Sequence, residues 1–182
     1  MWSKEFLVFL IFLSISTSMN AQGLNAFYSK CLSDKGQVDS IIEVCHQLED
    51  LFIDLDMLND RSPKSYLILS ENLADKKLKR DTDSIKQSFN EFEIRNHIEI
   101  DLLYYDFLEC MYLAIVENKT SVNSTNFIQY ETIKEINGAG FSYVNFKAMI
   151  NYAARNGDFS DVVHRIPLML GIMYYVQYGN EM

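Results

Sequence analysis

The chain has 182 residues, of which 48% are hydrophobic, and its 25 acidic and 16 basic residues give a net charge of −9. This composition excludes an intrinsically disordered chain, and the negative charge opposes binding to the phosphate backbone of nucleic acids. We therefore expect one globular domain with no nucleic acid as a partner; another protein with a basic surface is the partner that the charge favours. Taken alone, however, the charge is explained more simply by an acidic surface that keeps an exported protein soluble.

Residues 1–21 have the pattern of a signal peptide. An apolar run, FLVFLIFL, follows Lys4, and small polar residues lead from it to Ala21. The run is far shorter than the roughly 20 residues that cross a bilayer. We expect cleavage after Ala21, a secreted or periplasmic protein consisting of residues 22–182, and no transmembrane anchor in that part.

Three cysteines leave one unpaired if a single disulfide forms. Cys31 and Cys45 lie on either side of the Lys35-Gly36 turn, so their placement predicts a disulfide that joins two consecutive helices. Cys110 lies in an apolar stretch and is expected to be a buried thiol. Three reduced cysteines are the alternative.

The following segments have helical patterns. A helix from near Asp39 to near Asp60 is predicted by apolar residues at alternating steps of three and four, namely Val38, Ile41, Cys45, Leu48, Phe52 and Leu55. Ser62 and Pro63 supply an N-cap and a first-turn proline for the next helix, which ends in the basic run at 76–80. A longer helix is expected from about residue 81 to Asn118, with a break near Asn96.

The second half of the chain continues as helix. A polar loop at 118–125 precedes a helix whose start resembles a capping box, formed by Asn126 and Gln129. Glycines at 138 and 140 end that helix, and a further one covers 141–156. The last helix is interrupted by Pro167, where we expect a kink or a restart. These patterns together predict an all-α fold, a single-domain helical bundle of about six to seven helices.

Glu93, His97 and Asp101 form the best candidate for a chemical site, because steps of four place them along one helix edge. Projection places Asp101 on the side expected to face the core, together with Tyr105, Leu108, Tyr112 and Ile115. The row would suit a histidine base or a divalent cation. A row of helix-stabilising pairs with a satisfied, buried aspartate is the interpretation we favour.

Candidate binding residues fall into two groups. Acidic residues on one side of the segment 98–117 form the first group, and tyrosines near the end of the chain form the second, as an exposed patch suited to protein contacts. The candidates are Glu99, Asp106, Glu109, Tyr174, Tyr175 and Tyr178.

The sequence lacks the Gly-rich phosphate loop and the CxxC, HExxH and GxSxG motifs. We therefore predict no catalytic residue, metal or cofactor, and favour an exported acidic binding or inhibitor protein. In outline such a protein is similar to periplasmic immunity proteins, which neutralise toxins aimed at the cell envelope. The alternatives are an envelope hydrolase that uses carboxylates such as Asp101 or Glu109, and a structural envelope component.

Overall fold

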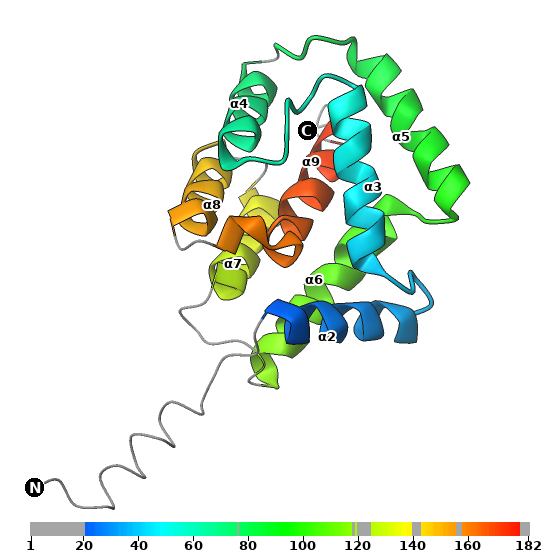
Figure 1. Cartoon of the computed structure of the whole chain (residues 1–182), viewed down its shortest axis with the longest axis vertical. Helices are drawn as coiled ribbons and strands as arrows, with labels where there is room; N and C mark the ends of the chain where they lie inside the picture. Colours follow the sequence, from blue (N-terminus) through cyan, green and yellow to red (C-terminus); the bar gives the residue numbers. More distant parts are fainter. Residues whose placement is uncertain are drawn as a thin grey trace, which may run out of the picture.

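The computed structural model describes residues 21–75, 77–117, 119, 125–139, 143–155 and 158–178. The predicted signal peptide up to residue 20 and most of the polar loop at 118–125 lie outside these ranges. Within them every regular element is a helix, which confirms the predicted all-α class. The helices pack into a single compact domain (Figure 1).

The described residues contain eight α-helices and two short 3-10 helices, slightly more than predicted. The elements are α2 (Ala21–Asp34), α3 (Ile41–Asp54), α4 (Pro63–Ala74), α5 (Thr82–Asn96), α6 (Ile100–Val116), α7 (Thr125–Ala139), α8 (Tyr143–Arg155), η1 (Asp158–Ser160), η2 (Val162–His164) and α9 (Ile166–Tyr178).

Helix α9 lies at the centre of the domain. It contacts α3, α5, α6 and α7, and Figure 1 shows it in orange and red among these helices. Its residues from Ile166 to Leu170 are all buried. Pro167 lies in the first turn of α9, where an N–H would have no partner within the helix, so the predicted restart is the start of the helix itself.

Side-chain caps fix the starts of three helices. Ser40, Ser62 and Asp81 accept hydrogen bonds from the backbone N–H of Glu43, Ser65 and Ser84, respectively. Helix α3 ends at Asp54, several residues before the predicted end near Asp60. The chain turns there because Asp56 adopts a left-handed conformation with φ of 56°.

The turn after α3 directs Met57 and Leu58 into the core, where they are 5% and 2% exposed. These two residues continue the apolar pattern of α3 without continuing its helix. The described helices do not include one that is long and apolar enough to cross a membrane.

Candidate functional site

A disulfide joins α2 to α6, and it differs from the one that the sequence predicted. Cys31 is bonded to Cys110, and their Cα atoms lie 6.0 Å apart. Cys45 is the free, buried cysteine. The prediction of a Cys31–Cys45 bond is therefore wrong. Cys110 is buried, as predicted, but it is disulfide-bonded and not a thiol. A disulfide is compatible with an oxidising compartment.

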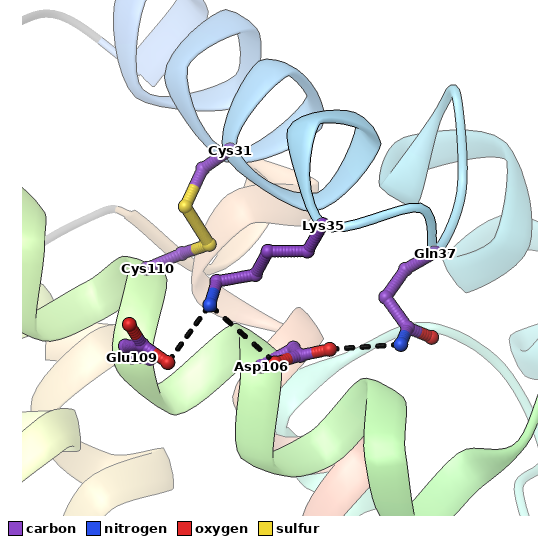
Figure 2. The surroundings of a disulfide bond; sticks show 6 residues. All are labelled: Cys31, Lys35, Gln37, Asp106, Glu109 and Cys110. Carbon is purple, nitrogen blue, oxygen red and sulfur yellow. Dashed lines mark hydrogen bonds and ion pairs between the residues drawn. A yellow bond between two sulfur atoms is a disulfide. The ribbon is translucent and has the colours of Figure 1, made fainter.

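The pairing follows from how the helices pack. Helix α2 lies across α6, and Cys31 is on the side of α2 that meets α6 (Figure 2). Cys45 lies on α3 one turn before Glu49, close enough to Glu49 and Arg165 for their charges to act on its thiol. Nearness in sequence had favoured Cys45 as the partner of Cys31. The true partner, Cys110, is 79 residues away and meets Cys31 only through the packing of α2 on α6.

Polar contacts next to this disulfide hold the turn after α2 against α6. The Lys35 Nζ donates to Glu109 Oε2 at 2.8 Å and lies 3.5 Å from Asp106 Oδ1. Gln37 Nε2 donates to Asp106 Oδ2 at 2.8 Å, as Figure 2 shows. Both carboxylates raise the pKa of Lys35, chiefly through the hydrogen bond to Glu109. Two of the three acidic binding candidates, Asp106 and Glu109, therefore contact the protein's own lysine.

The outward side of α6 carries exposed apolar side chains at steps of three and four. Its members, which we call the α6 face, are Leu102, Tyr105, Glu109, Tyr112 and Val116. The four apolar members are 48% to 55% exposed, and the side chain of Glu109 is 58% exposed. Helix α6 contains three acidic residues and no lysine, arginine or histidine. The α6 face therefore combines apolar surface with negative charge.

Tyr105 and Tyr112 were expected in the core, and this expectation is wrong. The buried side of α6 is formed instead by Ile100, Leu103, Tyr104, Phe107, Cys110, Met111 and Ala114. Because α6 is apolar on nearly every side, the spacing of its apolar residues does not decide which stripe faces inward. The exposed stripe has the same three-and-four spacing, so the sequence allowed a second assignment of the side of α6 that faces the core.

Tyr174 extends the α6 face onto α9. Its ring stacks on Tyr104 with centroids 4.8 Å apart, and its hydroxyl lies 2.9 Å from that of Tyr105. Tyr175 belongs to a different surface, a hollow of about 340 Å3 that also contains Leu73 and Arg80. Tyr178 is the last residue of α9, and its side chain lies outside the described part. The three tyrosines therefore do not share one described patch.

The row of Glu93, His97 and Asp101 is interrupted. His97 has a φ of 54° and ends α5, so the row bridges two helices instead of following one edge. Glu93 Oε1 accepts from the N–H of Ile100 at 2.7 Å and so caps α6 from the preceding helix. Asp101 is partly exposed, and its Oδ1 accepts from the N–H of Leu102. The predicted burial of Asp101 is therefore wrong.

Glu99 occupies the N-cap position of α6 without making a side-chain cap. It is exposed, and it lies three residues before Leu102, at the N-terminal end of α6. On the following helix, Gln129 does not form the predicted capping box. It is fully buried and donates from Nε2 to the carbonyl of His164 at 2.6 Å.

Two hollows flank Glu109. A groove of about 610 Å3 lies between α2 and α6, with Phe27, Cys31 and Leu113 among its lining residues. A smaller pocket of about 270 Å3, which we call the α6–α7 pocket, is lined by Leu108, Glu109, Tyr112, Tyr130 and Lys134. Glu109 thus lines a hollow on each side of α6.

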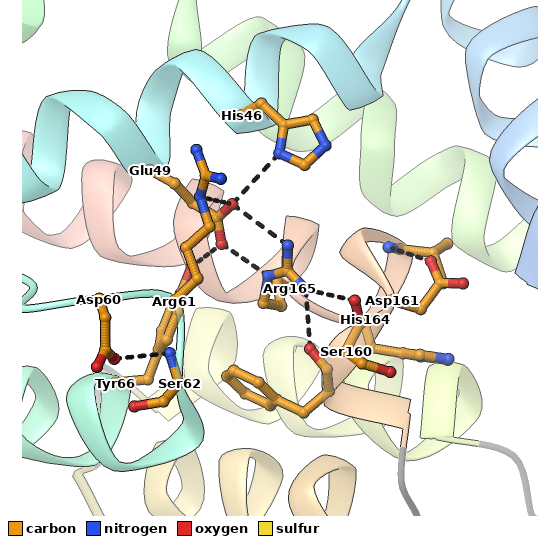
Figure 3. Close-up of polar contacts among 12 residues, drawn as sticks. His46, Glu49, Asp60, Arg61, Ser62, Tyr66, Ser160, Asp161, His164 and Arg165 are labelled. Carbon is orange, nitrogen blue, oxygen red and sulfur yellow. Dashed lines mark hydrogen bonds and ion pairs between the residues drawn. The ribbon is translucent and has the colours of Figure 1, made fainter.

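A second polar centre is buried, and the sequence did not single it out. Glu49 on α3 is 0% exposed. Its Oε1 accepts from Tyr66 Oη at 2.8 Å and from Arg165 Nε at 2.7 Å, and Arg165 Nη2 donates to Oε2 at 3.3 Å. Arg61 Nε lies 3.1 Å from Oε2, on the side open to solvent. Figure 3 shows these donors around the one carboxylate.

The hydrogens on Nη1 of Arg165 are also used. Its Nη1 donates to the carbonyls of Phe159 and Ser160 at 2.8 and 3.0 Å. Burial raises the pKa of Cys45 and of Tyr66, and the charge of Glu49 adds to the effect in both. A carboxylate with both oxygens occupied, next to a protonated thiol and phenol, is suited to joining α3, α4 and the η1–η2 segment. It is not arranged as a nucleophile or a base.

Among the described residues, no group of three or more His, Cys, Asp and Glu side chains is placed to hold a metal ion. Comparisons with protein-family models, with curated proteins and with solved structures give no match to this chain. The α6 face and its two hollows are the surface whose composition suggests recognition of a partner.

Proposed function

We propose that this protein is an exported binding protein of the inhibitor type, which recognises a protein with a basic surface through the α6 face. The observation that carries the proposal is the exposed stripe of Leu102, Tyr105, Tyr112 and Val116 around Glu109. Tyrosine is enriched among the residues that contribute most of the binding energy at protein interfaces, and the buried centre of an interface is more apolar than its rim. Half-exposed residues of this kind on one side of a single helix suit contact with a second protein.

The charge of the α6 face indicates the chemistry of the partner. Asp101, Asp106 and Glu109 are the charged residues of α6, and the chain as a whole has a net charge of −9. Lys35 neutralises part of this charge through Asp106 and Glu109. The remaining negative field attracts a basic surface and speeds its association. A partner with apolar side chains surrounded by lysine or arginine fits this surface best.

The test compares two variants that each place a charge on exposed apolar surface. Leu102→Asp changes the α6 face, and Val144→Asp, at a residue of α8 that is 70% exposed, is the matched control. Immobilised wild-type protein, incubated with an extract of the producing cells and their medium, should retain one stoichiometric basic protein. The Val144→Asp control should retain it as well, and Leu102→Asp should lose it. Thermal melts of both variants should resemble that of the parent.

A second measurement addresses the charge. Stopped-flow association with the retained protein should be at least about tenfold faster at low than at physiological ionic strength. The proposal would be rejected if Leu102→Asp retained the partner as well as the control does. It would also be rejected if no stoichiometric partner were recovered. An association rate that does not depend on salt would show that the acidic charge takes no part in recognition.

A further inference from the structure

The α6–α7 pocket has the size of a site for a single side chain. Its volume of about 270 Å3 lies just below the range of small-molecule sites. It opens beside Glu109, at the middle of the α6 face. A side chain of a protein seated on the α6 face would reach the pocket without any rearrangement of the helices.

The walls of the pocket combine a carboxylate with aromatic rings. Glu109 Oε2 is bound by Lys35, whereas Oε1 makes no hydrogen bond or ion pair with a described residue. The rings of Tyr112 and Tyr130 lie with centroids 6.0 Å apart and planes inclined by 32°. Tyr112 is 50% exposed, so part of this residue is accessible to a guest.

A carboxylate beside two aromatic rings suits a planar cation. An arginine guanidinium stacks on aromatic rings and donates to a carboxylate in the same plane, which a lysine ammonium does not do. The geometry points to the α6–α7 pocket as the binding site for an arginine side chain of the basic partner, an inference that rests on the function proposed above. Glu109 accepts from the guanidinium, and Tyr112 and Tyr130 form the surface on which it stacks.

Lys134 allows a test of whether the guest of the pocket is a cation or an anion. It lines the same pocket from α7, is exposed, and forms no ion pair with a described residue. Its positive charge opposes a cationic guest and favours an anionic one. Removing it should therefore strengthen the binding of arginine, whereas an acidic guest would bind more weakly without it.

The probe is arginine amide, and the control is citrulline amide, which has the same α-amino group and a side chain of the same shape without the charge. Both are titrated into labelled full-length protein at millimolar concentrations, and the shifts of the Tyr112 and Tyr130 ring signals are followed by NMR. Arginine amide should give saturable shifts at both rings, and citrulline amide should bind at least about threefold more weakly, the ratio that a cation–π contact of roughly 0.7 kcal/mol provides. Lysine amide tests whether the planar group matters.

Variants assign the contacts. Glu109→Gln should weaken the affinity for arginine amide by about threefold to tenfold, and Tyr112→Leu should reduce it by about threefold. Lys134→Ala should strengthen it by about twofold. All three side chains lie at the surface, and circular dichroism melts check that each variant is folded.

Three results would overturn the inference: equal binding of citrulline amide, weaker binding to Lys134→Ala, or ring shifts that do not saturate. None of these bears on the proposed function, which depends on whether Leu102→Asp loses its partner. Conversely, Leu102→Asp could lose the partner while Glu109→Gln binds it with unchanged affinity. That result would support the α6 face as the binding surface and reject the α6–α7 pocket as the site of an arginine side chain.

Discussion

Two glutamates of this protein have similar neighbours and opposite surroundings. Glu49 and Glu109 each pair with a basic residue from another part of the chain, and each lies near a tyrosine. Glu49 is 0% exposed with both oxygens occupied, whereas the side chain of Glu109 is 58% exposed and its Oε1 is open. A saturated carboxylate can only hold its neighbours together. A partly saturated one at the surface can still accept a new donor, so exposure and unused hydrogen-bonding capacity separate a structural role from a recognition role.

The largest effect should come from removing the buried carboxylate. Glu49→Ala leaves the charge of Arg165 buried without its ion-pair partner, and we expect the free energy of unfolding to fall by about 3–5 kcal/mol. Glu109→Ala is the control, because it removes an exposed ion pair that is worth less than about 1 kcal/mol. Urea unfolding followed by circular dichroism measures both. Losses of equal size would show that the two glutamates do not differ as the comparison states.

The disulfide should contribute the next largest effect, because it closes a long loop between α2 and α6. Replacing Cys31 and Cys110 together by serine should reduce the free energy of unfolding by about 2–4 kcal/mol. Helix α2 should stay in place, because Leu24, Tyr28 and Leu32 remain buried beneath it.

Mass spectrometry of the non-reduced protein checks the pairing directly. Peptides containing Cys31 should be linked to peptides containing Cys110, and the thiol of Cys45 should react with an alkylating reagent only after unfolding. A link between Cys31 and Cys45 would contradict the structure and restore the pairing that the sequence favoured.

The sequence was a good guide to most local features, although the capping box predicted at Gln129 is not formed. Ser62 caps the helix for which it was predicted as the N-cap, Ser40 and Asp81 cap helices that begin close to the predicted positions, and the break near Asn96 occurs at the next residue. These features depend on hydrogen bonds that span a few residues, so the sequence contains what determines them. The all-α class follows from many such signals that agree.

Features that depend on packing were predicted poorly. The disulfide and the Glu49–Arg165 pair join residues that are 79 and 116 positions apart, and periodicity does not report such contacts. The inward side of α6 was misassigned because both of its stripes are apolar. His46 and Glu49 were noticed only as neighbours in sequence, and Arg165, which supplies the buried charge, has no local signal at all. The acidic residues Asp106 and Glu109 were correctly placed away from the core, but their contacts with Lys35 were not foreseen.

The smallest effects should come from removing the hydroxyl groups of two tyrosines, one beside Glu49 and one on the α6 face. These two variants compare the buried centre with the exposed surface through the same chemical change. Tyr66→Phe removes a buried donor to Glu49 and should cost about 1.5–3 kcal/mol, whereas Tyr105→Phe removes a hydrogen bond at the exposed α6 face and should cost less than about 0.5 kcal/mol.

Burial and then the charge of Glu49 raise the pKa of Tyr66, so the folded state keeps its proton at a pH where the unfolded chain loses it. The stabilisation from this group is complete below the unfolded pKa of about 10 and is lost as the pH rises toward the folded value. Chemical denaturation at about pH 8 and pH 10.5 should therefore show a smaller difference between the parent and Tyr66→Phe at the higher pH. A cost for Tyr105→Phe equal to that for Tyr66→Phe would mean that the α6 face is part of the scaffold, not a surface kept for a partner.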